Sequence, residues 1–200
     1  MIKDNQYWDE IYSSNKISHE PSSFAKHVEK SHLQNGKSLL ELGCGNGRDS
    51  LFFAQNGKEV LALDFSTKTI TNLSSMNVKG VNFLHQDFSD LTSFRELDYV
   101  YSRFTMHSID EATEEKVFSQ LSQVLKVGGL FLMEARSTKD ERLEKTFGKD
   151  HFRRYLDFEI TIEKLKNLGF QIIEKEERRG LSPYGQEDPF LIRVVAKNCN

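Results

Sequence analysis

Cysteine and proline are scarce in this 200-residue chain, and positive charge is not in excess. There are 2 cysteines and 3 prolines, and 27 Lys+Arg face 30 Asp+Glu, a net charge of -3. Cys44 and Cys199 lie in a glycine-rich stretch and at the C-terminus, so we expect no disulfide framework and a reducing, cytoplasmic setting. The 38% hydrophobic content excludes a disordered chain. The missing basic excess disfavours a dedicated nucleic-acid-binding protein.

Long hydrophobic runs are missing too. Acidic residues occupy the N-terminal stretch where a signal peptide would be apolar, and no segment approaches the length that spans a bilayer. Export, membrane insertion and membrane partners are therefore not expected. The length allows one large domain, and no linker or repeat divides the chain. We expect a single domain over 1–200, with a helical cap at 1–36, a core at 37–135 and an acceptor-side connection with a C-terminal hairpin at 136–200.

Short apolar runs alternate with amphipathic stretches along the chain. The runs predict strands at Ser38–Leu42, Glu59–Leu63, Val81–Leu84, Leu97–Tyr101 and Gly129–Glu134. The clearest amphipathic stretch, Glu114–Leu125, places Val117, Leu121 and Val124 on one helical face. This alternation is typical of an α/β protein with a doubly wound, mostly parallel sheet and helices on both faces.

The two ends of the chain depart from that rhythm. A predicted helix at Thr161–Leu168 stops at Gly169, and two strand-like segments follow, Phe170–Lys175 and Phe190–Ala196. The stretch between them is too poor in helix formers for a crossover, so these segments predict an antiparallel hairpin. Tyr7–Tyr12 and Ser22–His32 read as two N-terminal cap helices.

A buried strand runs into glycines and then into a helix at residues 38–50. Gly43, Gly45 and Gly47 let a ligand approach the backbone, and the helix N-terminus offers N–H donors, which favours a nucleotide-like ligand. The dinucleotide pattern G-x-G-x-x-G needs its third glycine where Arg48 stands, so a nicotinamide-dependent oxidoreductase is the weakest alternative. A tight structural turn is the alternative explanation for the glycines.

Acidic residues follow the next two predicted strands. Asp64 ends one of them, where a carboxylate can accept hydrogen bonds from both hydroxyls of a ribose. Asp87 could bind the amino group of an adenine, and the adenine could lie beside the ring of the next residue, Phe88. Either acid alone could instead cap a helix.

These motifs resemble class I S-adenosylmethionine (SAM)-dependent methyltransferases from about Tyr7 to the hairpin. Within that superfamily, Gly45-Asn-Gly-Arg-Asp-Ser-Leu51 and Tyr7-Trp-Asp-Glu-Ile-Tyr12 are similar to tellurite-resistance and thiopurine-type enzymes. The resemblance implies a seven-stranded Rossmann-like sheet with a reversed last strand, and SAM as cofactor. The expected cofactor residues are Trp8, Glu41, Gly43, Cys44, Gly45, Gly47, Arg48, Asp64, Phe65, Ser66, Gln86, Asp87, Phe88, Ser102 and Arg103.

The loop after the fourth predicted strand is a candidate site for catalysis. Ser102-Arg-Phe-Thr-Met-His107 lacks the Asn/Asp-Pro-Pro-Tyr signature of methyltransferases that act on adenine amino groups or glutamine amides. His107 is a candidate general base because its unperturbed pKa is near neutral. A histidine that packs against or caps the next helix is the alternative.

Basic residues follow the fourth and fifth predicted strands, and more of them lie in the connection between the two hairpin strands. Guanidinium groups bind carboxylate and phosphate in a bidentate manner, so this set predicts an anionic acceptor. A solvated charged surface is the alternative. The expected substrate residues are Tyr7, Arg103, His107, Arg136, His151, Arg153, Arg154, Arg179 and Tyr184. No spaced Cys/His set is present in the sequence, so no metal is expected.

The leading interpretation is an enzyme that transfers a methyl group from SAM to a small, anionic, phosphorylated or nucleotide-linked acceptor, at oxygen. A thiopurine- or tellurite-type enzyme acting on a thiol, chalcogen or oxyanion is the second. A regulatory module that binds SAM without catalysis is the third.

Overall fold

The computed structural model describes residues 18–140 and 152–200. The chain forms two compact units, Met1–Phe88 and Ser89–Asn200, and each is considered by itself. The expected boundaries at 36 and 135 do not coincide with this division, and the single domain stays an expectation. In the described ranges, no helix is both long and apolar enough to cross a membrane.

Seven strands form one sheet in the order β3-β2-β1-β4-β5-β7-β6. One strand among them, β7 (Leu191–Asn198), is reversed and pairs antiparallel with both β5 (Leu125–Arg136) and β6 (Phe170–Arg178). This order and the flanking helices confirm the predicted Rossmann-like sheet with a reversed last strand and a terminal hairpin.

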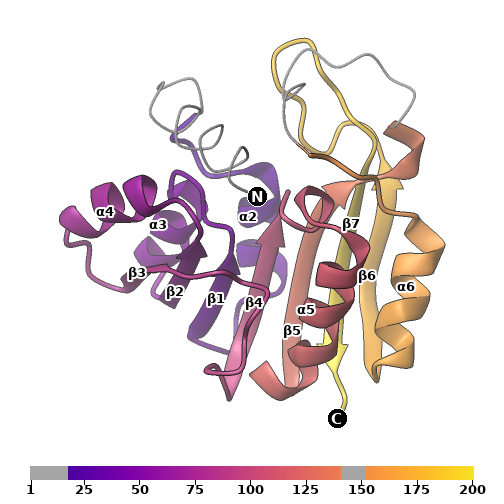
Figure 1. The fold of residues 1–200 in the computed structure, drawn as a ribbon, viewed down its shortest axis with the longest axis horizontal. Helices are drawn as coiled ribbons and strands as arrows, with labels where there is room; N and C mark the ends of the chain where they lie inside the picture. Colours follow the sequence, from indigo (N-terminus) through magenta and orange to yellow (C-terminus); the bar gives the residue numbers. More distant parts are fainter. Residues whose placement is uncertain (1–17, 141–151) are drawn as a thin grey trace. The chain divides into compact units, whose positions relative to one another are not determined.

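The first unit is built on three parallel strands, β1 (Ser38–Leu42), β2 (Glu59–Asp64) and β3 (Val81–His85). Their register pairs Leu42 with Leu63 and Leu63 with Leu84, so the three strands end at one level. Helices α3 (Arg48–Gln55) and α4 (Thr67–Ser75) connect them and lie beside the strands (Figure 1). The glycine loop, Asp64 and Asp87 lie at this level.

Helix α2 (Ser23–Ser31) confirms the second predicted N-terminal helix. Ser22 caps it, because its side chain accepts a hydrogen bond from the Ala25 N–H. Phe24 and Val28 are fully buried, as expected for an apolar face turned to a core. The other predicted cap helix, Tyr7–Tyr12, lies outside the described residues.

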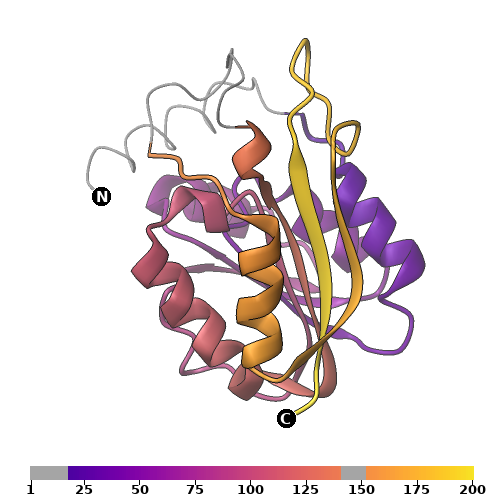
Figure 2. The ribbon, with the colours of Figure 1, turned by 90° about the vertical axis from the view of Figure 1, so that its right-hand side faces the viewer.

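The second unit contains β4 (Leu97–Arg103), α5 (Glu111–Val124), β5, α6 (Phe158–Asn167), β6 and β7. Short 3-10 turns, η1 (Met106–Ser108) and η2 (Thr138–Asp140), follow β4 and β5. Figure 2 shows α5 and α6 side by side along one face of these strands. The Phe118 ring meets the Phe131 ring edge-on at 5.7 Å, which packs α5 onto β5.

The boundary between α5 and β5 differs from the prediction. The helix ends at Val124 and β5 begins at Leu125, whereas the sequence pattern predicts that Leu125 is helical and that the strand starts at Gly129. Leu125 pairs with Leu97, and the register then shifts before Leu130 pairs with Tyr99. Gly128, at φ 85°, sits in this irregularity. A glycine bulge interrupts the alternation of apolar and polar residues in this strand. The sequence pattern therefore does not indicate the first half of β5.

A row of alternating charges crosses the second unit's strands near one end. Register places Arg103, Glu134 and Arg193 opposite one another on β4, β5 and β7. Glu134 is fully buried, and its two oxygens accept from Arg103 Nε at 2.9 Å and from Arg193 Nε at 2.7 Å. The two arginines thus satisfy a carboxylate that could not otherwise be buried.

We expect Glu134→Gln to lower the free energy of unfolding by about 3 kcal/mol, because it removes the charge that compensates two largely buried guanidinium groups. Urea unfolding measures this. Asp98→Asn is the matched control, since Asp98 pairs with a half-exposed lysine, Lys126, and should cost less than about 1 kcal/mol. Equal losses for the two variants would contradict the central role of Glu134.

Candidate cofactor site and acceptor side

The glycine loop connects β1 to α3 through left-handed backbone. Gly43, Gly45 and Gly47 have φ of 72°, 53° and 75°, a region that other residues rarely adopt. A side chain at Gly47 would also clash, since its Cβ would lie 2.9 Å from Leu73 Cδ2. Gly47 is the N-cap of α3. The glycine spacing is therefore a structural requirement of this turn, and it brings the loop backbone to the end of β1.

Asp64 is fixed at the end of β2 by that loop. The Gly45 N–H donates to its Oδ2 at 2.8 Å, and the Ser66 N–H donates to its Oδ1 at 2.9 Å. Each carboxylate oxygen can accept more than one hydrogen bond, so an Asp held from two sides keeps its acceptor capacity in a set direction. This arrangement suits a ligand that presents a pair of hydroxyls.

The turns after β2 and β3 lie against each other in the first unit. The Gln86 N–H donates to the Asp64 carbonyl at 3.1 Å, and the His85 ring contacts the Phe65 carbonyl at 3.0 Å. Phe65 remains 43% exposed, and Asp87 is exposed. An exposed phenyl ring and an exposed carboxylate near Asp64 match the expected surroundings of a nucleoside. Ser66, another expected cofactor residue, caps α4 by accepting from the Thr69 N–H.

Glu41 is a buried acid on β1, 4% exposed. Burial raises its pKa well above the ordinary 4.5, and the neighbouring Asp49 and Asp64 carboxylates raise it further, against a hydrogen bond from the Ser50 hydroxyl. Burial and the same Asp64 carboxylate also raise the pKa of the Cys44 thiol. The surroundings of the glycine loop therefore favour the protonated forms of the Glu41 carboxyl and the Cys44 thiol.

Sequence reasoning missed how the glycine loop holds the segment before α2. The Asp49 carboxylate accepts from both the N–H and the hydroxyl of Ser22, each at 2.7 Å. The Asn46 amide and the Arg48 guanidinium donate to the Ser18 carbonyl at 3.1 and 3.4 Å. Arg48, expected to bind cofactor, thus contacts the chain itself. No local pattern links residues this far apart in sequence.

In the second unit, the end of β4 carries Ser102, Arg103 and Phe104. Ser102 is fully buried, and its Oγ has no hydrogen-bond partner among residues 18–140 and 152–200. Phe104 takes a left-handed φ of 58°, which is strained for a bulky residue. Its ring lies 4.1 Å beneath the Arg103 guanidinium and 5.3 Å from the His107 ring. Strained backbone thus places an aromatic ring close to both a cation and an imidazole.

His107 lies in the 3-10 turn after β4 and is 3% exposed. Its Nδ1 accepts a hydrogen bond from the Arg136 N–H at 3.1 Å, which leaves the ring proton on Nε2. The acceptor nitrogen of the neutral ring is therefore already used inside the protein. This geometry is unfavourable for a general base, and the catalytic role of His107 stays a prediction.

The predicted arginine cluster is largely charge-compensated. Arg103 binds Glu134, and its Nη2 donates to Ser182 Oγ at 3.0 Å. Arg136 binds Asp140 at 2.6 Å and Glu187 at 3.0 Å, and Arg154 binds Glu114. Three of the expected acceptor-binding guanidinium groups thus have carboxylate partners within the protein, so they do not form a purely basic pocket.

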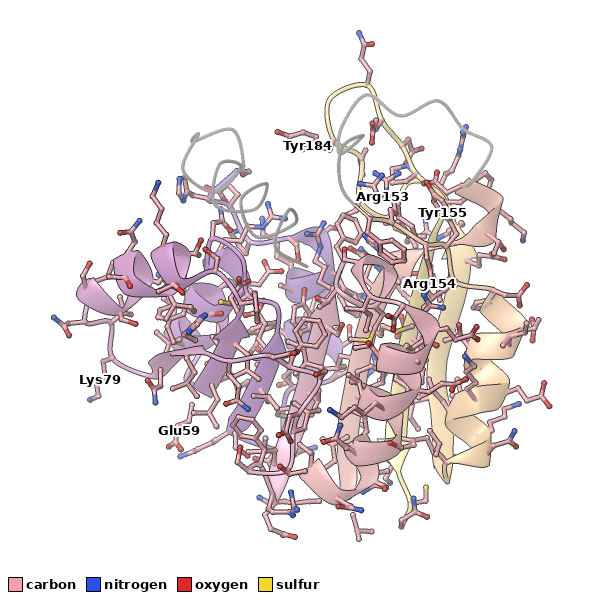
Figure 3. The ribbon with its side chains drawn as sticks, in the orientation of Figure 1. Glu59, Lys79, Arg153, Arg154, Tyr155 and Tyr184 are labelled. Carbon is pink, nitrogen blue, oxygen red and sulfur yellow. The ribbon has the colours of Figure 1, made fainter. Side chains whose placement is uncertain are left out.

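The other expected acceptor residues have different surroundings. The Arg179 guanidinium lies 5.0 Å from the centre of the Phe190 ring. Tyr184 is 50% exposed and projects from the connection between β6 and β7, while Arg153 lies near Tyr155 beside the strand ends (Figure 3). Tyr7, Trp8 and His151, which the sequence also nominates, lie outside the described residues.

We expect Glu41→Gln to stabilise the protein, and more so as pH rises. A raised folded-state pKa means that the protonated carboxyl is favoured in the fold, so native stability falls as pH climbs from the unfolded pKa through the folded one. Glutamine cannot ionise. The stability difference should therefore grow between about pH 4 and 8 by ~1.4 kcal/mol or more, the equivalent of one pKa unit.

Denaturant unfolding of both proteins across this pH range measures the difference. Glu59→Gln is the control, because Glu59 is an exposed carboxyl at the start of β2 (Figure 3). A Glu41→Gln difference that shrinks as pH rises would contradict the prediction.

Residues 39–129 match the family described as a methyltransferase domain. Among solved structures, the Burkholderia thailandensis 1,6-didemethyltoxoflavin-N1-methyltransferase, determined with S-adenosylhomocysteine, superimposes with a TM-score of 0.74. That likeness covers 98% of this chain and 86% of the other at 15% identity, so it concerns the fold. Residues 39–129, from β1 into β5, are thus similar to a methyltransferase domain.

Curated relatives match parts of the chain. An uncharacterized methyltransferase of Synechocystis sp. is 29% identical over 107 residues, which are 53% of this chain and 50% of the relative. Phosphoethanolamine N-methyltransferase 1 of Arabidopsis thaliana is 31% identical over 124 residues, 59% of this chain and 25% of the relative. The matched region thus spans half of the first relative and a quarter of the second.

SAM is the expected cofactor, and the first unit's residues fit it. The left-handed glycines bring backbone to the strand end, and the doubly held Asp64 carboxylate suits the two ribose hydroxyls. The expected adenine contacts of Asp87 and Phe88 stay a prediction. The expected similarity to tellurite- and thiopurine-type enzymes stays a prediction.

Proposed function

We propose that this protein transfers the methyl group of SAM to a small anionic acceptor. The observation that carries the proposal is the Asp64 carboxylate, held by the Gly45 and Ser66 N–H groups at the end of a left-handed glycine loop. SAM, when bound, supplies a methyl group activated by its sulfonium leaving group. The protein's task is then to align the acceptor and exclude water, which needs few catalytic side chains.

An anionic acceptor is supported by an exposed arginine on the connection between β6 and β7 and by a relative. With Arg103, Arg136 and Arg154 paired to carboxylates, we assign the acceptor's anionic group to Arg179. A relative at 31% identity carries the name phosphoethanolamine N-methyltransferase, whose substrate is small and phosphorylated. A phosphate monoester is thus our preferred anionic group.

An amine is our preferred acceptor atom, in place of the hydroxyl that the sequence interpretation favours. A hydroxyl must lose its proton as the methyl group arrives, which calls for a general base, whereas an ammonium group can release its proton to water before transfer, and the neutral amine then carries the attacking lone pair. The Nδ1 atom of His107 already accepts a hydrogen bond from the Arg136 N–H. The name of the same relative also favours nitrogen.

An acceptor panel tests the proposal. We expect phosphoethanolamine to gain about 14 Da per transferred methyl group in mass spectrometry after incubation with enzyme and SAM. Ethanolamine, phosphorylated sugars and thiopurines test for the phosphate, an oxygen acceptor and a sulfur acceptor. Calorimetric binding of SAM without modification of any acceptor would favour the non-catalytic binding module, and methylation of the thiopurines alone would favour the thiopurine-type alternative.

His107→Ala separates the two acceptor atoms. If a hydroxyl is methylated with His107 as base, kcat should fall by about 100-fold. With an amine acceptor we expect only a several-fold loss, because no base is removed from the reaction. SAM affinity, measured by calorimetry, should remain near that of the native protein. A loss of about 100-fold with an amine would contradict this account.

A further inference from the structure

Strand β3 forms the edge of the sheet in the first unit. In the part of the chain that the structure describes, it is the last strand on its side and pairs with β2 alone (Figure 1). Edge strands usually carry charged residues or proline, because their unpaired backbone groups otherwise recruit another strand. The other edge strand, β6, follows this rule and ends in successive charged residues at 174–178. The sequence of β3, Val-Asn-Phe-Leu-His, contains neither a formal charge nor proline.

The hydrogen bonds at the two ends of β3 show which of its backbone groups face outward. The Gly80 carbonyl accepts from the Val60 N–H at 2.8 Å, and the Gln86 N–H donates to the Asp64 carbonyl at 3.1 Å. Successive residues of a strand direct their backbone groups to opposite sides, so the even-numbered residues face β2. The N–H and C=O groups of residues 81, 83 and 85 therefore point to the open side of the sheet.

A groove lies beside this edge, between the end of α4 and β3. It has a volume of about 280 Å³, and its apolar lining comes from Leu73, Val78, Val81 and Phe83. Side chains of alternate strand residues share one face, so the His85 ring lies on the same face as the groove. The His85 Nε2 lies 3.1 Å from Thr67 Oγ1 in the first turn of α4, which agrees with this placement. The groove and the His85 ring thus occupy opposite ends of one edge.

We propose that a second copy of this chain binds antiparallel along β3, so that the protein is a homodimer joined by this edge. An antiparallel pair centred on Phe83 overlaps the two strands completely and pairs their outward backbone groups. It places Val81 opposite the partner's His85. Because paired side chains lie on the same face, the His85 ring of each copy meets the groove of the other. The inference goes beyond the proposed function, since it requires neither SAM nor an acceptor.

Charge complementarity supports a second copy in this register. Lys79 and Asp87 are exposed and flank β3 at its two ends, and Lys79 is directed away from the ribbon (Figure 3). With Phe83 at the centre, Lys79 of each copy lies opposite the partner's Asp87. A parallel pairing in register would bring like charges together at both ends, so the flanking residues select the antiparallel arrangement.

Sedimentation equilibrium of the full-length protein over a wide range of concentration tests the proposal. We expect a species of twice the 23.1 kDa chain mass. Val81→Pro should raise the dissociation constant of the dimer by about tenfold or more, because symmetry removes an outward N–H twice. The bonds to β2 are kept, since proline is tolerated on the open side of an edge strand.

Lys79→Glu changes the charge without altering the strand, so it tests the proposal even if Val81→Pro fails to fold. It should raise the dissociation constant by about fivefold or more, because each copy then opposes two acids. The double variant Lys79→Glu/Asp87→Lys should restore the native value. Lys175→Glu, on the charged edge strand β6, is the matched control and should dimerise like the native protein.

Disulfide trapping tests the register. In the proposed dimer, residue 82 lies opposite the partner's residue 84 as a non-hydrogen-bonded pair, with Cα atoms about 4.5 Å apart and within reach of a disulfide. We therefore expect oxidation to link Asn82→Cys chains to Leu84→Cys chains in a mixture, with Cys199 replaced by serine in both. Neither variant alone should form a linked dimer.

A native protein that stays monomeric at every concentration overturns the proposal. So does a dimer that both Val81→Pro and Lys79→Glu leave at native affinity, because the copies would then meet through another surface. Cross-linking of Asn82→Cys or Leu84→Cys alone, in the absence of the mixed product, would overturn the pairing centred on Phe83. Weakening by both substitutions, rescue by the charge swap and a linked product from the mixture alone would establish it.

Discussion

A buried carboxylate, Glu134, is the point on which the strand ends of the second unit depend. A charge without water needs partners, and Glu134 obtains them from β4 through Arg103 and from β7 through Arg193. Those guanidinium groups continue to the β6–β7 connection, where Arg103 reaches Ser182 and Arg193 Nη2 reaches the Leu181 carbonyl at 2.9 Å. One acid thus links the reversed strand, its neighbours and the loop that they carry.

The first unit uses the same chemistry for a different purpose. Asp64 is oriented by the backbone N–H groups of Gly45 and Ser66, so its charge is fixed in direction. Nearby, Glu41 is buried beside other acids, and its pKa rises. An oriented acid at the strand end and a protonation-prone acid beneath it are suited to a ligand rich in hydroxyl and amino donors.

Charge compensation changes how the arginines that follow the strands are interpreted. In sequence they form a basic set, and this suggests a broad anion pocket. In the structure, three of these arginines bind carboxylates: Arg103 binds Glu134, Arg136 binds Asp140 and Glu187, and Arg154 binds Glu114. Recognition of an anionic acceptor then falls, in our proposal, to fewer side chains.

Much of the fold could be predicted from local patterns. Ser38–Leu42 is a strand with the predicted bounds, and the hairpin after Gly169 follows from the scarcity of helix formers between its strands. The start of β5 could not be predicted, since the glycine bulge hides the alternation and pairing with Leu97 selects the strand. The periodicity of apolar residues indicates which side chains are buried, whereas strand pairing depends on a partner segment elsewhere in the chain.

By itself, the sequence determined the strand-loop-helix unit around Gly43–Gly47 and the acid that ends β2, because left-handed backbone and strand ends leave residue-specific signatures. Tertiary structure alone decided the partners of the charged residues. Asp49 meets Ser22 across 27 positions, and Arg154 meets Glu114 across 40. Such pairs depend on packing and strand register, which bring together residues that no spacing rule connects.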